Sequence, residues 1–491
     1  MNRGENMTEV PDTKDFIVKD GYLSFILPFA YRKKQIRKAA DVLKKDGFHF
    51  FTLEDPGGRI NDLYEGSIEI SQEELDQYFL PYVERKIFPP TVEEYGFHRF
   101  YKVIGEDFTL TADGERYPFR FMSLDVTLGP FGIAFLTSRV RLLEENLPLS
   151  SVLNFMQHFR ATENKLKEEK GSIIHCGDGK DFSSIHEFLL DRLASAIRPF
   201  IIHDERLTGY FGSLPYFEDE RMFVTSFLFA EPGTEFSDEQ LFRIGRVDGL
   251  SPEGKPFISA SNMNYIRDYL DKYLHDRWAP DLYTLATDFS YTNVTTKSSE
   301  EMQRPLAHFM GTHYYNFLLH YFYRIMLLRV SFEYSRLKWD KDEEYLKRLI
   351  ELITIFSSWY YFKHVSVRQE GRELGLLFRQ AFSLDDLFQE VRTTLDELYR
   401  TQENAAANSM NLLLFFLTVF TVISGIYGMN LVIDDWKNDT SWSEISSYGL
   451  FGWIALITAL LGIGMSVYLF FTYLGRIVWR KLKRKLDDLD F

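Results

Sequence analysis

The sequence predicts a cytoplasmic α/β domain, then long stalk helices, then two C-terminal transmembrane helices. Strand-like runs of β-branched and aromatic residues dominate the first 300 residues, and long helical patterns follow. No formal charge lies between Glu403 and Asp434, or between Glu444 and Arg476. Each of these two stretches exceeds the roughly 20 residues that cross about 30 Å of hydrocarbon, and a backbone in lipid must be helical.

Residues 1–300 contain both strand and helix signals. The helical spacing of apolar residues favours helices over 149–166, 184–197 and 262–276. Runs rich in β-branched and aromatic residues predict strands at Phe48–Leu53, Phe97–Ile104, Phe119–Leu128, Gly132–Leu136 and Phe223–Phe229.

Long helices are expected in residues 301–403. The uncharged stretch Pro305–Tyr323 contains three histidines and an asparagine, which hydrocarbon would penalise, so we interpret it as a helix buried in an aromatic core. A second helix is expected over 341–364. From Leu384 the apolar residues form one helical stripe, and no glycine or proline intervenes before Gly425. One helix of about 70 Å is therefore expected over 384–429.

The C-terminal part divides by its charge pattern. The N-terminus lacks an apolar signal core, and the second uncharged stretch is followed by a basic tail, so both termini are expected in the cytoplasm. The expected location is the cytoplasmic membrane, as a multi-pass protein contacting lipid. The predicted parts are transmembrane helix 1 (404–430), an external acidic loop with Asp434 and Asp435 (431–446), transmembrane helix 2 (447–475) and the basic tail (476–491).

Composition limits the functional classes. The net charge of −15 argues against direct nucleic-acid binding, and a lone cysteine, Cys176, excludes an internal disulfide framework. The chain shows no Ser/His/Asp or Cys/His arrangement typical of an enzyme, so no catalytic residue is predicted. One basic cluster is a solvated helix face or a site for an anionic ligand; it consists of Arg32, Lys33, Lys34, Arg37 and Lys38.

The first uncharged stretch carries a polar stripe. Helical steps of three and four residues place Asn404, Ala407, Met410, Leu414, Thr418 and Thr421 on one face. Such a stripe suits the lining of a narrow pore. The alternative is that the threonines bond back to their own helix and the small residues allow close packing.

The segment Gly425–Asn430 resembles the Gly-Met-Asn signature of the CorA family of magnesium channels. It stands where that family has it, at the outer end of the first of two C-terminal spans. The resemblance implies a CorA-like funnel, assembled as a homopentamer, with Gly428, Met429 and Asn430 as the selectivity site. Asn430 would bind a hydrated Mg²⁺, because this ion sheds water reluctantly.

The same resemblance assigns roles along the polar stripe. Thr421 would form a second polar ring and Asn404 a ring near the cytoplasmic mouth, while Leu414 or Met410 would form a hydrophobic constriction. The outer loop lacks the family's common Met-Pro-Glu-Leu pattern, and the cytoplasmic part is larger than a minimal channel of this family requires. The family's regulatory Mg²⁺ sites cannot be assigned to named residues in this chain.

Two functional hypotheses remain at this point. The first is a CorA-like channel for Mg²⁺, and for Co²⁺ or Ni²⁺. The second is a CorA-like membrane effector of a prokaryotic antiviral system, whose enlarged cytoplasmic domain binds a nucleotide second messenger that opens the pore. Both hypotheses expect divalent cations and copies of the same chain as partners.

Overall fold

The computed structural model describes residues 14–53, 63, 68–162, 171–202, 221–335 and 343–428, with 449–451 and scattered positions up to 468. The chain divides into two compact units, Met1–Arg392 and Thr393–Phe491.

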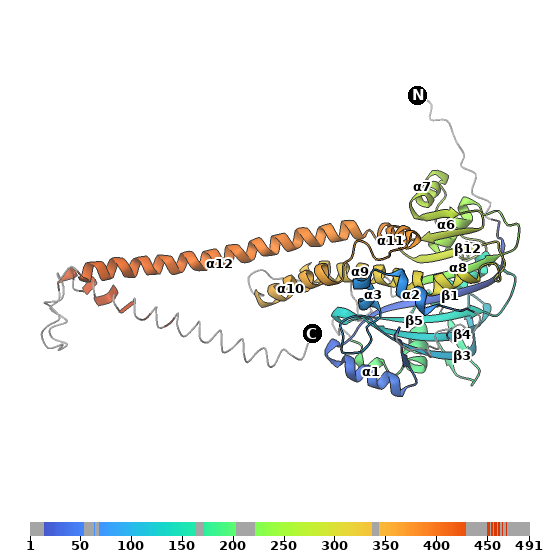
Figure 1. The fold of residues 1–491 in the computed structure, drawn as a ribbon, viewed down its shortest axis with the longest axis horizontal. Coiled ribbons are helices and arrows are strands. Elements are labelled where there is room, and N and C mark those ends of the chain that lie inside the picture. The colour runs from blue at the N-terminus through green and yellow to red at the C-terminus, as the bar shows by residue number, and fades with distance from the viewer. Residues whose placement is uncertain are drawn as a thin grey trace, which may run out of the picture. The chain divides into compact units, whose positions relative to one another are not determined.

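Within the described residues, 12 strands form one mixed sheet in the N-terminal unit (Figure 1). The strand order is β10-β11-β12-β9-β1-β5-β4-β3-β7-β8, with β2 beside β3 and β6 beside β1. The pair β9 and β12 is parallel, and the other pairs are antiparallel. The strands are β1 (Ile17–Ala30), β2 (His49–Phe50), β3 (His98–Ala112), β4 (Glu115–Leu128), β5 (Ile133–Leu142), β6 (Leu147–Pro148), β7 (Ile173–Cys176), β8 (Asp181–Phe182), β9 (Phe223–Ala230), β10 (Leu274–Trp278), β11 (Leu282–Ala286) and β12 (Ser290–Thr295).

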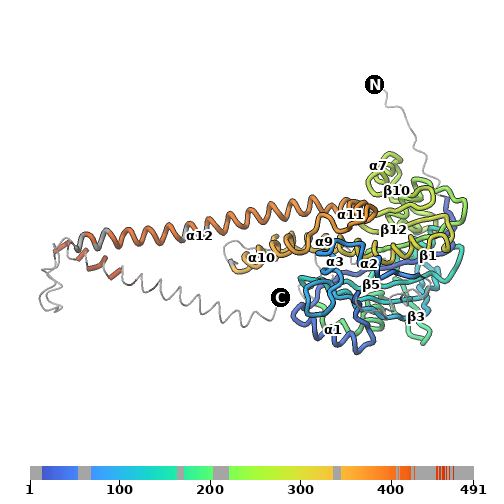
Figure 2. Tube along the Cα trace, viewed as in Figure 1, coloured from blue at the N-terminus to red at the C-terminus, as the bar shows by residue number. Residues whose placement is uncertain are grey.

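Helices cover the sheet and its ends. In Figure 2, α7 lies at the end of the sheet that carries β10 and β12, and α1 lies at the β3 end. Helix α6 packs against α7, β11 and β12. The helices are α1 (Ile36–Lys45), α2 (Gln72–Tyr78), α3 (Pro81–Ile87), α4 (Leu149–Arg160), α5 (Ile185–Glu187), α6 (Asp238–Arg246), α7 (Met263–Tyr273), α8 (Gln303–Met310), α9 (Thr312–Ser335), α10 (Glu343–Trp359), α11 (Gln369–Ala381) and α12 (Leu384–Gly428).

The central strands are buried on both faces, which explains their nearly continuous apolar sequences. Every residue of β9 is buried, and so are eight consecutive residues of β1 from Tyr22. On β1, Phe25 contacts the rings of α4, with Phe159 at a centroid distance of 4.5 Å. On the neighbouring strand β5, Phe135 contacts Tyr321 of α9 instead, at 5.7 Å. Side chains alternate between the two faces of the sheet along each strand, so one face packs against α4 and the opposite face packs against α9.

A buried ionic group joins α9 to the sheet. Asp125 of β4 lies 2.6 Å from Arg99 Nε and 2.8 Å from Arg139 Nη1, and all three side chains are almost completely buried. Burial alone would raise the pKa of Asp125, but Arg139 and Arg99 hold it below its usual value. Arg99 also donates to the hydroxyl of Tyr315 on α9. Removing one member would leave an uncompensated buried charge, so this group fixes α9 on the sheet.

The prediction of a buried helix at Pro305–Tyr323 is confirmed, with a break that the pattern did not indicate. Gly311 ends α8, and α9 starts at Thr312. A Cβ at Gly311 would lie 2.9 Å from Ile70 Cγ2, so no larger residue fits there without a shift. The strands predicted at 97–104, 119–128, 132–136 and 223–229 are present as β3, β4, β5 and β9.

The prediction of two C-terminal transmembrane helices is wrong. Over the residues that the structure describes, no helix combines the length and the apolar character needed to cross a membrane. The prediction rested on missing charge, and an uncharged stretch is not a uniformly apolar one: Asn404, Asn411, Thr418 and Thr421 interrupt the first segment. The same finding contradicts the description of the chain as a membrane channel and its expected multi-pass location in the cytoplasmic membrane.

The predicted membrane segments are only partly described. Residues 404–428 belong to α12, a helix of 45 residues. Of the second segment, 447–475, only Gly449–Phe451 and scattered positions to Tyr468 are described. The acidic loop 431–446 and the basic tail 476–491 lie outside the described residues.

Candidate functional site

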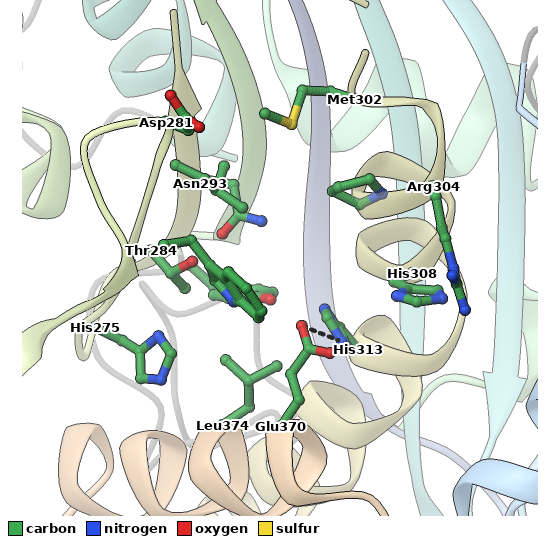
Figure 3. A pocket seen from close by; sticks show the side chains of 14 residues that line it. His275, Asp281, Thr284, Asn293, Met302, Arg304, His308, His313, Glu370 and Leu374 are labelled. Atoms are coloured by element: carbon green, nitrogen blue, oxygen red, sulfur yellow. Dashed lines mark ion pairs between the residues drawn. The ribbon is translucent and has the colours of Figure 1, made fainter. Parts of the chain in front are cut away.

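A cavity of about 300 Å³ lies in the N-terminal unit, between the β10–β12 meander and helices α8, α9 and α11. Its apolar lining includes Trp278, Leu282, Met302 and Leu374. Polar and charged groups from the meander and from the helices line the same cavity on both sides (Figure 3). They are His275, Thr284, Asn293, Arg304, His308, His313 and Glu370. An apolar cavity with a few convergent polar groups is the usual form of a small-molecule site.

Four buried polar atoms that line this cavity have no hydrogen-bond partner among the described residues. They are His275 Nδ1, Tyr291 Oη, Asn293 Oδ1 and His313 Nε2. Leaving a buried donor or acceptor unsatisfied costs about 1–3 kcal/mol each. A fold tolerates four such atoms around one cavity when something else satisfies them, either water or a ligand.

Three of the lining residues form a compact group of metal-ligand type. His308 on α8, His313 on α9 and Glu370 on α11 each offer one donor atom, and these atoms all lie within 4.8 Å of one another. In one continuous helix, residues five apart would point about 140° away from each other. The break at Gly311 removes this constraint, and the two imidazole centroids lie 5.7 Å apart.

Neighbouring helices hold these three residues in place. Glu74 Oε2 of α2 lies 3.0 Å from His308 Nε2. The N-terminus of α11 is fixed by Asn316 of α9, whose amide donates to the carbonyl of Gly371 at 2.9 Å and to the hydroxyl of Tyr78 at 3.2 Å. A Cβ at Gly371 would lie 2.3 Å from Ser366 Oγ, so α11 approaches this neighbour as closely as glycine allows.

The cavity favours neutral side chains at its buried end. Burial, and to a smaller extent the electrostatic influence of the neighbouring His308, Arg368 and His275, lowers the pKa of His313 to about 3. Burial, with Tyr78 and Glu370 nearby, raises the pKa of Tyr291 well above its usual value. At neutral pH His313 is therefore an uncharged imidazole, and Tyr291 keeps its proton.

Helix α11 connects the cavity to the start of α12. Glu370 and Leu374 line the cavity from its first turns. At its other end Arg379 Nη2 contacts Asp385 of α12 at 2.5 Å and the hydroxyl of Tyr361 at 2.8 Å. The ring of Tyr361 stacks on Phe388 of α12 at a centroid distance of 4.2 Å. A displacement of α11 would therefore reach the base of α12.

Comparison with protein-family models, with curated proteins and with solved structures finds no match to this chain. The resemblance to the CorA family therefore stays a hypothesis based on the sequence signature alone.

The structure does not bring the predicted site residues together in this cavity. The stripe of Asn404, Met410, Leu414, Thr418 and Thr421 is exposed along α12. Both threonine hydroxyls donate to their own helix at 2.8 Å, Thr418 to the carbonyl of Leu414 and Thr421 to that of Leu417. These are the bonds that the alternative to a pore lining expects, and the pore-lining role of the stripe stays a prediction.

The remaining predicted residues are outside the cavity or outside the described chain. Gly428 is the last residue of α12. Met429, Asn430, Asp434 and Asp435 lie outside the described residues.

The basic cluster of Arg32, Lys33, Lys34, Arg37 and Lys38 lies at the start of α1 and does not line the cavity. Lys33 is partly buried over the rings of Tyr95 and Phe131, and Arg37 lies 3.9 Å from Glu93 in an exposed ion pair.

Proposed function

We propose that the N-terminal unit binds a small organic ligand in the cavity between the β10–β12 meander and α8, α9 and α11, and that the ligand controls α12 through α11. The observation that carries this proposal is the set of four buried polar atoms around one cavity for which the described part of the chain supplies no hydrogen bond. Of the two hypotheses from the sequence, the nucleotide-binding effector agrees better with such a cavity than the Mg²⁺ channel, which requires no site for an organic ligand.

The cavity offers groups that can bind the base, the sugar and the phosphate of a nucleotide. Trp278 offers an indole against which a flat base stacks. Asn293 and His275 offer buried hydrogen-bonding atoms for the base or the sugar. Arg304 carries a guanidinium on the rim, which pairs bidentately with phosphate.

Ligand binding is relayed because α11 forms part of both the cavity wall and the junction with α12. A ligand that contacts Glu370 or Leu374 favours one position of α11, and Arg379 and Tyr361 transmit that position to Asp385 and Phe388. A ligand shifts such an equilibrium only by its difference in affinity for the two positions. The proposal therefore requires direct contact between ligand and α11.

The test is a binding screen of the full chain against AMP, ATP and a cyclic dinucleotide by calorimetry and thermal unfolding. A ligand at about 100 times its Kd adds about 2.7 kcal/mol to the free energy of unfolding. The substitution Asn293→Leu removes a cavity amide, so we expect it to abolish this gain. The double variant Arg37→Ala/Lys38→Ala, in the basic cluster outside the cavity, should retain it.

The two variants separate the two sites that an anionic ligand has available. If binding is lost in Arg37→Ala/Lys38→Ala and kept in Asn293→Leu, the ligand occupies the basic cluster and the cavity proposal is wrong. If none of the nucleotides binds the wild-type chain, a nucleotide is the wrong ligand class.

A further inference from the structure

The lower end of the cavity carries an unusual pair of groups. His313 is 5% exposed, and its Nε2 has no hydrogen-bond partner among the described residues. Glu370 Oε1 lies 3.5 Å from this atom, as the dashed line in Figure 3 marks. A protonated Nε2 with a carboxylate so near would normally form a hydrogen bond of about 2.8 Å. The two atoms instead stand at a separation that suits an atom bound between them.

The spacing agrees with shared coordination of one ion. Two ligands at about 2.1 Å from a tetrahedral metal ion are about 3.4 Å apart. The pair of His313 and Glu370 is already at 3.5 Å. The His308 donor atom lies within 4.8 Å of both, so a closing movement of about 1.4 Å or less completes the geometry.

We infer that His308, His313 and Glu370 bind one divalent transition-metal ion, of the class of Zn²⁺, Co²⁺ or Ni²⁺, with a coordination position left open toward the cavity. Three protein ligands plus an open position are typical of zinc sites that bind a further molecule. The inference rests on the proposed function only in that the cavity ligand would meet the ion at this open position.

The donor set selects the kind of metal. Two imidazoles and one carboxylate suit Zn²⁺, Co²⁺ and Ni²⁺, whereas Mg²⁺ takes oxygen ligands in a near-ideal octahedron and keeps several of its waters. This site therefore differs from the predicted Asn430 site, which would contact Mg²⁺ through its hydration shell.

The surroundings support the three ligands in the manner of a built metal site. The Glu74 carboxylate lies 3.0 Å from His308 Nε2, and such outer carboxylates orient metal-binding imidazoles. Arg304, at 3.3 Å, pairs with Glu74 and balances its charge. Asn316 holds the carbonyl of Gly371, the residue after Glu370, at 2.9 Å. All three contacts come from helices packed inside the N-terminal unit.

The test uses tag-free full-length protein dialysed against a chelator and titrated with Co²⁺ alone and with Zn²⁺ alone. We expect one ion per chain by elemental analysis, and a visible Co²⁺ absorption that Zn²⁺ abolishes. His308→Gln and Glu370→Gln should each weaken Zn²⁺ binding by more than about 100-fold, and Glu74→Gln by about 10–100-fold. Circular dichroism of each variant checks that it is folded.

The matched control is Glu373→Gln. Glu373 lies one turn further along α11 and pairs with Arg277 at 2.7 Å, so its loss should leave Zn²⁺ affinity unchanged. The inference is overturned if the wild-type protein binds no ion. It is also overturned if the folded double variant His308→Gln/Glu370→Gln binds Zn²⁺ as tightly as the wild-type protein does. Because these titrations contain no nucleotide, a failure of nucleotide binding leaves their outcome unaffected.

Discussion

Buried His320 makes the stability of the N-terminal unit depend on pH. It lies on α9 with 1% of its surface exposed, and its Nδ1 donates to the carbonyl of Asn316 at 2.8 Å. Burial, together with the charge of Arg379 on α11, lowers the pKa of His320 to about 4 although its hydrogen bond opposes the shift. The substitution His320→Asn removes the titrating imidazole and supplies an amide that can donate to the same carbonyl.

The sign and size of the effect follow from proton linkage. The unfolded chain protonates His320 near pH 6.5, whereas the folded chain does so only near pH 4. The contribution of His320 is therefore complete above about pH 6.5 and is lost as the pH falls through 4. The loss is about 1.4 kcal/mol per pH unit, which amounts to about 2 kcal/mol between pH 7 and pH 5.

The measurement is urea unfolding followed by circular dichroism at pH 7, 6 and 5. His98 and His313 also have lowered pKa values and contribute equally to both proteins, so the difference between the two curves isolates His320. We expect His320→Asn to lose about 2 kcal/mol less than wild type between pH 7 and pH 5. Parallel pH dependences in the two proteins would refute the argument that His320 is neutral and buried in the folded state.

Three further predictions concern packing, charge and assembly. Gly371→Ala should destabilise the chain by about 1–3 kcal/mol because the Cβ meets Ser366, whereas Gly375→Ala, with its nearest contact at 3.5 Å, should be neutral or stabilising in the same urea assay. Arg243→Met should cost about 3 kcal/mol, since it leaves the half-buried carboxylate of Asp15 without the buried guanidinium that pairs with it at 2.8 Å; the exposed ion pair of Arg267 should contribute less than about 1 kcal/mol. The resemblance to CorA predicts a mass near five protomers by light scattering, and Leu414→Glu should lower it; a monomeric wild type would contradict this.

Local patterns predicted much of the fold. The strands β3, β4, β5 and β9 follow from β-branched and aromatic runs, and the buried helix at 305–323 follows from an uncharged but histidine-rich stretch. Strand β1 was not predicted, because the run Phe25–Phe29 contains a proline, which is unusual inside a central strand. The strands β10–β12 were also not predicted, because they are short and because β10 and β12 are rich in polar residues.

The candidate site could not be predicted because its residues come from distant parts of the chain. His275, Asn293, His308, His313 and Glu370 are joined by sheet pairing and helix packing that no local pattern encodes. The one available signal was the pair of histidines on either side of Gly311, which the sequence reasoning used only as an argument against insertion into lipid.

The position of β1 in the sheet constrains how the chain is made on the ribosome. Strand β1 is synthesised before its partners: it pairs with β5 and with the short β6, but its remaining neighbour, β9, follows roughly 200 residues later in the chain. At about 5–20 residues per second, the interval from Leu142 to Phe223 lasts about 4–16 s. During that time a long, apolar strand edge has no partner. Such an edge pairs readily with other chains, so chaperone capture of the nascent protein should be strongest in this interval and end when β9 emerges.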